Sequence, residues 1–254
     1  MDRKVRERRR SVHRERGRRR AVIAGCVIAV LILLGVFLWL RSSSVFAVRV
    51  ITVTGLTHVS SQTISEATAS AKGVNLLRLD TDSLKQKLLA LPYVKTVSIH
   101  RKFPNTLELT LSEYQPVACL LMQDGSSWVV SAEGRILEQK ADRALPVVVS
   151  EAPVWPKAGA FLPATVVSAL QVATAVTDET LAAQLHNISQ IKVAPHGELT
   201  VVLANSVELR LGQGTDLNQK LKVAATIIQQ YLRDGKGLTY IDVSVPGKAA
   251  VNEK

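Results

Sequence analysis

The longest apolar run of the chain lies close to its N-terminus. Residues 21–40 read AVIAGCVIAVLILLGVFLWL, with neither a charge nor a proline. At about 1.5 Å of rise per residue, a helix of this length spans roughly 30 Å, the thickness of a hydrocarbon core. Trp39 stands near one end of the run, where an amphipathic ring prefers the membrane interface. The pattern therefore predicts a transmembrane helix at 21–40.

A cleaved signal peptide and a buried core helix can also contain a long apolar run. A cleaved signal peptide has a shorter apolar region, of about 7–15 residues, and a small-residue cleavage site. Here the run is longer, and the SSSVFA sequence at 42–47 is a poor cleavage site. A buried core helix of this length would carry a polar face. We therefore expect the helix to be retained in the membrane.

Residues 46–114 predict a small domain of their own. Leu107, Leu109 and Leu111 alternate with polar residues, as expected of a strand with one buried face. Two short amphipathic patterns precede it and predict helices. The expected order is a strand at 48–55, helices at 61–72 and 81–91, and strands at 94–101 and 106–112. Two helices on one face of a three-stranded sheet form a small α+β domain.

Residues 115–246 predict a second, β-rich domain with a C-terminal helix and strand. Runs of β-branched residues bounded by glycine, proline and polar residues predict its strands. A helix capped by Thr215 or Asp216 ends before Gly235. The expected order is a hairpin at 119–139, a strand at 145–149, a helix at 164–176, strands at 188–193, 199–203 and 207–211, a helix at 217–232 and a strand at 238–245. Residues 247–254 are expected to be a flexible tail, and the whole fold to be α+β.

The formal net charge of +11 is concentrated at the N-terminus. Residues 1–20 hold eleven Lys or Arg and three Asp or Glu, so they carry +8 of the total. This bias predicts a basic tail in the cytoplasm, with the domains outside it, because loops rich in Lys and Arg stay inside. A disordered topology signal that also touches anionic lipid is the favoured interpretation of the tail. A nucleic-acid arm and a partner-binding segment are the alternatives. No nucleic-acid binding is expected of the folded part.

The residue pattern predicts neither catalysis nor a cofactor or metal. Of the two cysteines, Cys26 should lie in the membrane and Cys119 in the folded domain outside it. Cys119 is expected to be a small core residue. No cluster of Cys and His with zinc spacing occurs. Gly212-Gln213-Gly214 lacks the third glycine of a dinucleotide fingerprint and predicts a plain turn. An active site needs a nucleophile, a base and an orienting group together, and we find no such set.

Several short motifs occur in a fixed order along both regions. The first region contains Val53-Thr54-Gly55-Leu56, Gly73-x-Asn75-Leu76-Leu77-x-Leu79-Asp80, Leu91-Pro92-Tyr93-Val94-x-x-Val97-x-Ile99, Arg101-x-Phe103-Pro104-Asn105-Thr106-Leu107 and Glu113-x-x-Pro116-Val117-Ala118. The second contains Val207-x-Leu209-x-Leu211-Gly212, Lys220-Leu221 and Tyr240-Ile241-Asp242-Val243. This series resembles the FtsQ/DivIB family of bacterial cell-division proteins, with a POTRA domain at 46–114 and an FtsQ-type β domain at 115–246. Two positions depart from the family pattern. Many relatives are expected to have Trp where this chain has Phe103, and a basic residue where it has Ser244.

The resemblance implies a non-enzymatic scaffold of the division machinery, the divisome. Such a protein crosses the inner membrane once and is enriched at the septum. It recruits FtsB-type and FtsL-type partners, with septal synthase components as further partners, and helps to control septal peptidoglycan synthesis. An alternative is a POTRA-containing accessory protein of polypeptide transport, although transport proteins usually carry tandem POTRA copies and a membrane barrel. A membrane-tethered enzyme is disfavoured by the missing catalytic set.

The final expected strand is the predicted partner-binding site. Between Tyr240 and Val245 apolar and polar residues alternate, and no later strand is expected. A strand at the end of a chain easily forms a sheet edge, whose unpaired backbone groups can accept a partner strand. In the resembled family the partner lies beside this last strand. The predicted partner-binding residues are Tyr240, Val243, Ser244, Val245, Pro246, Gly247 and Lys248.

Overall fold

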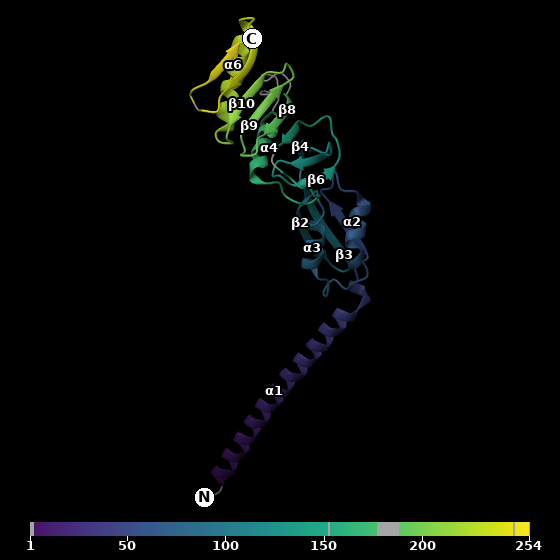
Figure 1. The fold of residues 1–254 in the computed structure, drawn as a ribbon. Coiled ribbons are helices and arrows are strands. Elements are labelled where there is room, and N and C mark those ends of the chain that lie inside the picture. Colours follow the sequence, from purple (N-terminus) through teal and green to yellow (C-terminus); the bar gives the residue numbers. More distant parts are fainter. Residues whose placement is uncertain (1–2, 152, 177–187, 246, 254) are drawn as a thin grey trace. The chain divides into compact units, whose positions relative to one another are not determined.

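The computed structural model describes residues 3–151, 153–176, 188–245 and 247–253, with side chains from Ile23 onward except at position 176. The predicted α+β class is confirmed: an N-terminal apolar helix precedes a small domain with a three-stranded sheet and a β-rich region (Figure 1). The chain forms two compact units. The first comprises residues 1–54, 64–85 and 98–110, and the second comprises residues 55–63, 86–97 and 111–254.

The N-terminal helix, α1, runs without interruption over Arg3–Ser42. Its segment Ile23–Ser42 is long and apolar enough to cross a membrane, with a mean hydropathy of 2.9 and no part buried in the structure. The basic tail therefore continues the helix rather than being disordered, since Arg and Glu are good helix formers next to an existing helix. A short 3₁₀ turn, η1 (Ser44–Phe46), follows.

A three-stranded sheet follows the helix, and its strands lie in the order β1-β3-β2. The parallel pairing of β1 with β3 joins Val50 to Thr106 and Thr54 to Thr110. Leu107, Leu109 and Leu111 are buried, which confirms the predicted alternation. The elements are β1 (Val50–Thr54), α2 (Ser61–Thr68), η2 (Ala69–Ala71), α3 (Thr81–Leu89), β2 (Val94–Lys102) and β3 (Thr106–Glu113).

The second unit is built on a nine-stranded sheet with the order β12-β11-β10-β9-β8-β7-β4-β5-β6. Most neighbouring pairs are antiparallel, and β4–β7, β7–β8 and β10–β11 are parallel. Its strands are β4 (Pro116–Leu121), β5 (Ser127–Ser131), β6 (Ile136–Gln139), β7 (Val147–Ser150), β8 (Ile188–Val193), β9 (Leu199–Leu203), β10 (Glu208–Gly212), β11 (Leu238–Asp242) and β12 (Ala250–Glu253).

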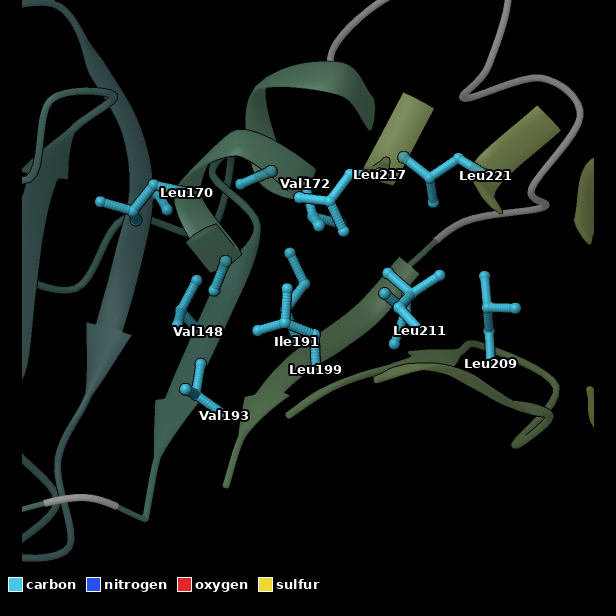
Figure 2. Close-up of a cluster of buried hydrophobic side chains, with 14 of the residues drawn as sticks. Val148, Leu170, Val172, Ile191, Val193, Leu199, Leu209, Leu211, Leu217 and Leu221 are labelled. Atoms are coloured by element: carbon cyan, nitrogen blue, oxygen red, sulfur yellow. The ribbon is translucent and has the colours of Figure 1, made fainter. Parts of the chain in front are cut away.

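Two helices, α4 (Ala164–Val176) and α6 (Leu217–Arg233), pack on this sheet and on each other. Figure 2 shows Leu217 and Leu221 of α6 facing Leu211 and Leu209 of β10, and Leu170 of α4 belongs to the same cluster. These side chains belong to one continuous apolar core. Burial of such a core is the main favourable term in folding. Because Leu209 of β10 and Ile241 of β11 belong to this core, its burial holds the last strands in the sheet.

The structure corrects the prediction at three points near the C-terminus. Residues 238–245 do not form one strand, because β11 ends at Asp242. The segment after it is not wholly a flexible tail, since Ala250–Glu253 form β12. Asp216 precedes α6 but makes no side-chain capping hydrogen bond, because its backbone is in the left-handed region with φ 54°.

Candidate functional site: the C-terminal edge of the large sheet

The last two strands of the chain form one end of the nine-stranded sheet. β11 pairs with β10 on one side and with β12 on the other, so Ile241 lies opposite both Leu209 and Val251. β12 is the terminal strand of the sheet order, and within the described residues no strand pairs with its outer side. A four-residue edge strand of this kind presents backbone N–H and C=O groups that another chain can use.

The opposite end of the sheet is more protected. There the edge strand β6 is met by a loop, and the backbone N–H of Ile136 donates to the carbonyl of Ala160 at 2.9 Å. The N–H of Gly159 donates in turn to the carbonyl of Ile136 at 2.8 Å. Arg135 and Phe161 form an isolated bridge beside them. Part of the β6 edge is therefore already occupied by the chain itself, and β12 is the more available edge.

A small pocket of about 210 Å³ lies beside the β11–β12 connection. Its apolar wall comes from α6 and from the connecting segment, and its remaining lining is polar. The lining residues are Asp216, Gln219, Lys220, Val223, Val243, Val245, Gly247 and Ala249. This volume is below the roughly 300–1,000 Å³ typical of small-molecule sites and suits a single apolar side chain. Val245 is 54% exposed and so is already presented to solvent.

A buried lysine holds one wall of this pocket. Lys220 is 3% exposed, and its Nζ donates to the carbonyls of Leu211 at 2.8 Å and Gln213 at 2.9 Å. These bonds tie the start of α6 to the turn after β10. A buried ammonium must be hydrogen-bonded to be tolerated, and the two carbonyls supply its partners. Lys220 is therefore a structural support of the pocket.

A close backbone approach fixes the other wall. Gly212 has φ +64°, and a Cβ added there would lie 2.7 Å from the Cβ of Ser244. The Asp242 carboxylate accepts hydrogen bonds from the Ser244 hydroxyl at 2.6 Å and from its backbone N–H at 2.9 Å. The hydroxyl bond, the backbone bond and nearby Arg210 together hold the pKa of Asp242 below its usual range, although burial opposes them. The segment after β11 is thereby held in a defined turn.

Charged and aromatic groups surround the edge strand. The Arg210 guanidinium lies 4.3 Å from the ring centroid of Tyr240, a cation–π contact. Glu253 of β12 accepts hydrogen bonds from the Tyr231 hydroxyl at 3.2 Å and from Lys236 Nζ at 3.3 Å. The hydrogen bond from Lys236 to Glu253 and the attraction between their charges raise the pKa of Lys236. The far end of β12 is thus anchored to the end of α6.

Comparison with known proteins identifies the family. The FtsQ-type POTRA domain model matches residues 46–114, and the model of the C-terminal region of cell division protein FtsQ/DivIB matches residues 119–244. Together the two models match more than three quarters of the chain. The chain belongs to the FtsQ/DivIB family. This is a family of cell-division proteins, and the resemblance drawn from the sequence motifs is confirmed.

Curated relatives of this family come from several bacteria. The chain is 31% identical over 115 residues to cell division protein FtsQ of Corynebacterium glutamicum, a match covering 45% of the chain and 50% of the relative. It is 30% identical to FtsQ of Anaeromyxobacter sp. (strain K), covering 70% of the chain and 61% of that relative. It is 26% identical to FtsQ of Neisseria meningitidis, covering 85% and 86%. The chain thus spans about half of the Corynebacterium relative, about three fifths of the Anaeromyxobacter relative and most of the Neisseria relative.

The structure gathers several of the predicted site residues at this end of the sheet. Val243, Val245 and Gly247 line the pocket, and Tyr240 lies in β11. Lys248 is exposed, and its backbone N–H donates to the carbonyl of Val245 at 3.1 Å, closing the turn. Ser244 hydrogen-bonds Asp242 instead of facing outward freely. Pro246 lies outside the described residues.

The prediction that the strand through Tyr240 and Val245 is the sheet edge is wrong, because β12 covers β11. β12 was not predicted, because its residues, AVNE, hold only one β-branched residue and directly follow a polar turn. Lys220 and Val223 of the pocket were not predicted as site residues either. Their spacing on α6 could have placed them on one face, but nothing in the sequence shows what that face meets.

Proposed function

We propose that this protein is a single-pass cell-division protein that binds FtsB-type and FtsL-type partners by accepting a strand at β12. The carrying observation is the outer side of β12, which no strand of the described residues occupies, next to an apolar pocket of about 210 Å³. Membership of a cell-division family supports partners from the division machinery, and the FtsB and FtsL types are the finer part of the proposal. Recruitment of these partners to the septum would let the protein influence septal peptidoglycan synthesis.

Strand addition combines two kinds of recognition. Backbone hydrogen bonds along β12 contribute affinity without regard to sequence, and a side-chain pocket contributes specificity. In an added strand, alternate side chains point to the same face, so one of them can reach a pocket beside the sheet end. Val243, Val245 and Ala249 give this pocket an apolar wall that suits an aliphatic or aromatic anchor.

The proposed topology rests on the apolar helix. Ile23–Ser42 would cross the membrane, with the basic tail in the cytoplasm and both folded units outside it. A fluorescent reporter active only in the cytoplasm should glow when fused before Met1 and stay dark when fused after Lys254. A bright C-terminal fusion would contradict this topology, and with it the proposed site of partner binding.

A pair of proline variants tests strand addition at β12. Adjacent residues of a strand point their N–H groups to opposite sides, so Val251 and Asn252 differ in which edge they serve. The two variants are Val251→Pro and Asn252→Pro, and each removes one backbone N–H donor. The variant whose N–H faces β11 should lose a bond within the sheet and show a lower melting temperature. The variant whose N–H faces outward should leave the domain stable and weaken binding of the purified FtsB-type partner at least about tenfold. If the stable variant binds the partner like the parent, the proposed edge is wrong.

A matched pair of charge variants tests the pocket. Val245→Asp places a carboxylate in the pocket, and Leu232→Asp places one on the exposed end of α6, where the side chain is 49% exposed and outside the pocket. Both variants should fold, since both positions are exposed. Only Val245→Asp should weaken partner binding, because an anchor side chain would have to desolvate the new charge. Equal binding by the two variants would remove the pocket from the proposal.

A further inference from the structure

Three segments of the first unit form a continuous surface next to the end of the membrane helix. They are residues 44–50, 72–79 and 101–105, and we call this surface the collar. The backbone N–H of Leu76 donates to the carbonyl of Phe46 at 2.8 Å, and that of Val48 donates to the carbonyl of Val74 at 2.9 Å. The N–H of Arg49 donates to the carbonyl of Asn105 at 2.9 Å. The three segments are therefore hydrogen-bonded to one another.

One side chain ties the collar directly to the helix end. The Asn75 amide donates to the carbonyl of Leu40 at 3.0 Å and to that of Ser43 at 2.9 Å. Its Oδ1 accepts the N–H of Leu77 at 2.9 Å, so the side chain is held on both sides. Carbonyls in the last turn of a helix lack partners within the helix, and Asn75 satisfies one of them. The collar therefore lies within hydrogen-bond distance of the point where the candidate span ends.

The collar leaves about half of three apolar side chains exposed in the described structure. Phe103 is 53% exposed, and its ring lies edge-on to that of Phe46 with centroids 5.9 Å apart. Val45 and Val50 are 54% and 50% exposed. Apolar side chains on neighbouring segments beside a membrane helix would be buried by insertion into the interface. Phe103 lies in the β2–β3 turn, which gives it the reach to do so.

The same segments carry positive charge and no negative charge. Their sequences hold five Lys or Arg and no Asp or Glu. Lys102 is paired with Glu108 at 2.7 Å, which leaves Arg49, Lys72, Arg78 and Arg101 without a carboxylate partner in the described part of the chain. Exposed aromatic and aliphatic groups combined with basic residues are the features of a surface that binds anionic lipid.

We propose that the collar docks onto anionic lipid headgroups, with Phe103 inserted at the membrane surface. The inference rests on the proposed membrane span, because the Asn75 bonds place the collar at the end of that span. A second protein helix beside the span is the competing occupant. Lipid is favoured because the surface is continuous with the helix end and because its charge complements phosphate. Docking would limit how the folded units move above the membrane.

The test uses the full chain in lipid nanodiscs with a nitroxide spin label at position 103. The labelled protein carries Phe103→Cys and Cys26→Ala, and the native Cys119 is too buried, at 4% exposed, to react. A matched protein carries the label at Ser98→Cys, an exposed position five residues earlier on β2 and so roughly 17 Å away along the strand. Accessibility to oxygen relative to a water-soluble nickel complex reports the depth of each label.

In discs containing phosphatidylglycerol, the label at position 103 should have a higher oxygen-to-nickel ratio than the label at position 98. The double variant Arg49→Gln/Arg78→Gln should lower that ratio. Each basic residue at an anionic surface raises the docking equilibrium constant by roughly fivefold. Loss of both arginines should therefore lower the ratio of docked to undocked protein by about 25-fold. Lys85→Gln/Lys222→Gln removes the same charge outside the collar and should leave the ratio unchanged. Discs of phosphatidylcholine alone should resemble the Arg49/Arg78 variant.

Failure of the proposal and failure of the span give different results. If the protein stays in the discs but position 103 is as accessible to nickel as position 98, the collar does not contact lipid. If position 103 becomes protected only when a partner protein is added, the occupant is protein and the lipid proposal is wrong. If the protein does not remain with the discs at all, the proposed membrane span is wrong as well.

Discussion

A buried carboxylate provides a sharp test of how the second unit is held together. Glu113 at the end of β3 has a side chain that is only 1% exposed. It accepts the backbone N–H of His58 at 2.7 Å and that of Val59 at 3.0 Å, and its Oε2 lies 3.1 Å from His58 Nδ1. The His58 ring is stacked on Tyr93 with centroids 5.2 Å apart. Glu113 therefore fixes the 57–59 loop against the strand.

Replacing Glu113 with glutamine should lower the free energy of unfolding at neutral pH by roughly 2–4 kcal/mol. A hydrogen bond to a charged group contributes about 1.5–3 kcal/mol. The amide of glutamine can accept one of the two N–H donors but places an NH₂ group against the other, so one bond is lost and one weakened. The exposed pair Glu108–Lys102 gives a control, since surface ion pairs contribute about 0–1 kcal/mol and Glu108→Gln should matter little.

The effect should depend on pH in a defined direction. Burial pushes the pKa of Glu113 upward, but hydrogen bonds from the backbones of His58, Val59 and Thr57 and from the His58 ring outweigh it, so the pKa is lowered. A lowered folded-state pKa gives stability that is present above the ordinary pKa of glutamate and is lost as the pH falls through the folded value. The difference between parent and Glu113→Gln should therefore shrink on acidification.

Urea unfolding of the detergent-solubilised chain, followed by tryptophan fluorescence and repeated from neutral to acidic pH, measures both effects. A Glu113→Gln variant as stable as the parent at neutral pH, or one whose deficit stays constant as the pH falls, would refute this account of the carboxylate.

Three further predictions concern the C-terminal end of the sheet. Gly212→Ala should destabilise more than Gly235→Ala in thermal unfolding: both glycines have positive φ, but a Cβ at Gly212 would lie 2.7 Å from Ser244, whereas Gly235 faces open space. Leu221→Ala removes a fully buried side chain and should lower the unfolding free energy by about 2–5 kcal/mol in urea titrations, with the same loss at all pH values. Lys248→Glu reverses an exposed charge beside the pocket and should leave thermal stability unchanged while slowing partner association modestly in stopped-flow or surface binding.

Much of this fold follows from local sequence pattern. The helix at 164–176 was predicted at the bounds that the structure shows, because its apolar face repeats regularly and Pro163 precedes it. The strand holding Leu107, Leu109 and Leu111 has one buried face, which strict alternation makes readable. Cys119 is 4% exposed, which confirms its expected place in the core.

The candidate site was only partly predictable. Val243 and Val245 were proposed as members of the last expected strand and Gly247 as a residue just beyond it, and all three line one pocket. What the sequence could not reveal is the pairing of β12 with β11, because four residues carry almost no periodic signal and their pairing is set by the sheet they join. Lys220 was missed for a similar reason: its burial depends on two carbonyls that lie seven and nine residues away.

The most direct test of the central claim is photo-crosslinking in dividing cells. A photoreactive amino acid at Asn252, which is exposed on β12, is compared with one at Gln139, which is exposed at the end of β6 on the opposite edge of the sheet. Our account predicts that position 252 crosslinks to a small single-pass division protein of the FtsB or FtsL type, identified by mass spectrometry, and that position 139 does not. Crosslinking of that partner at position 139, with none at position 252, would contradict recognition at β12.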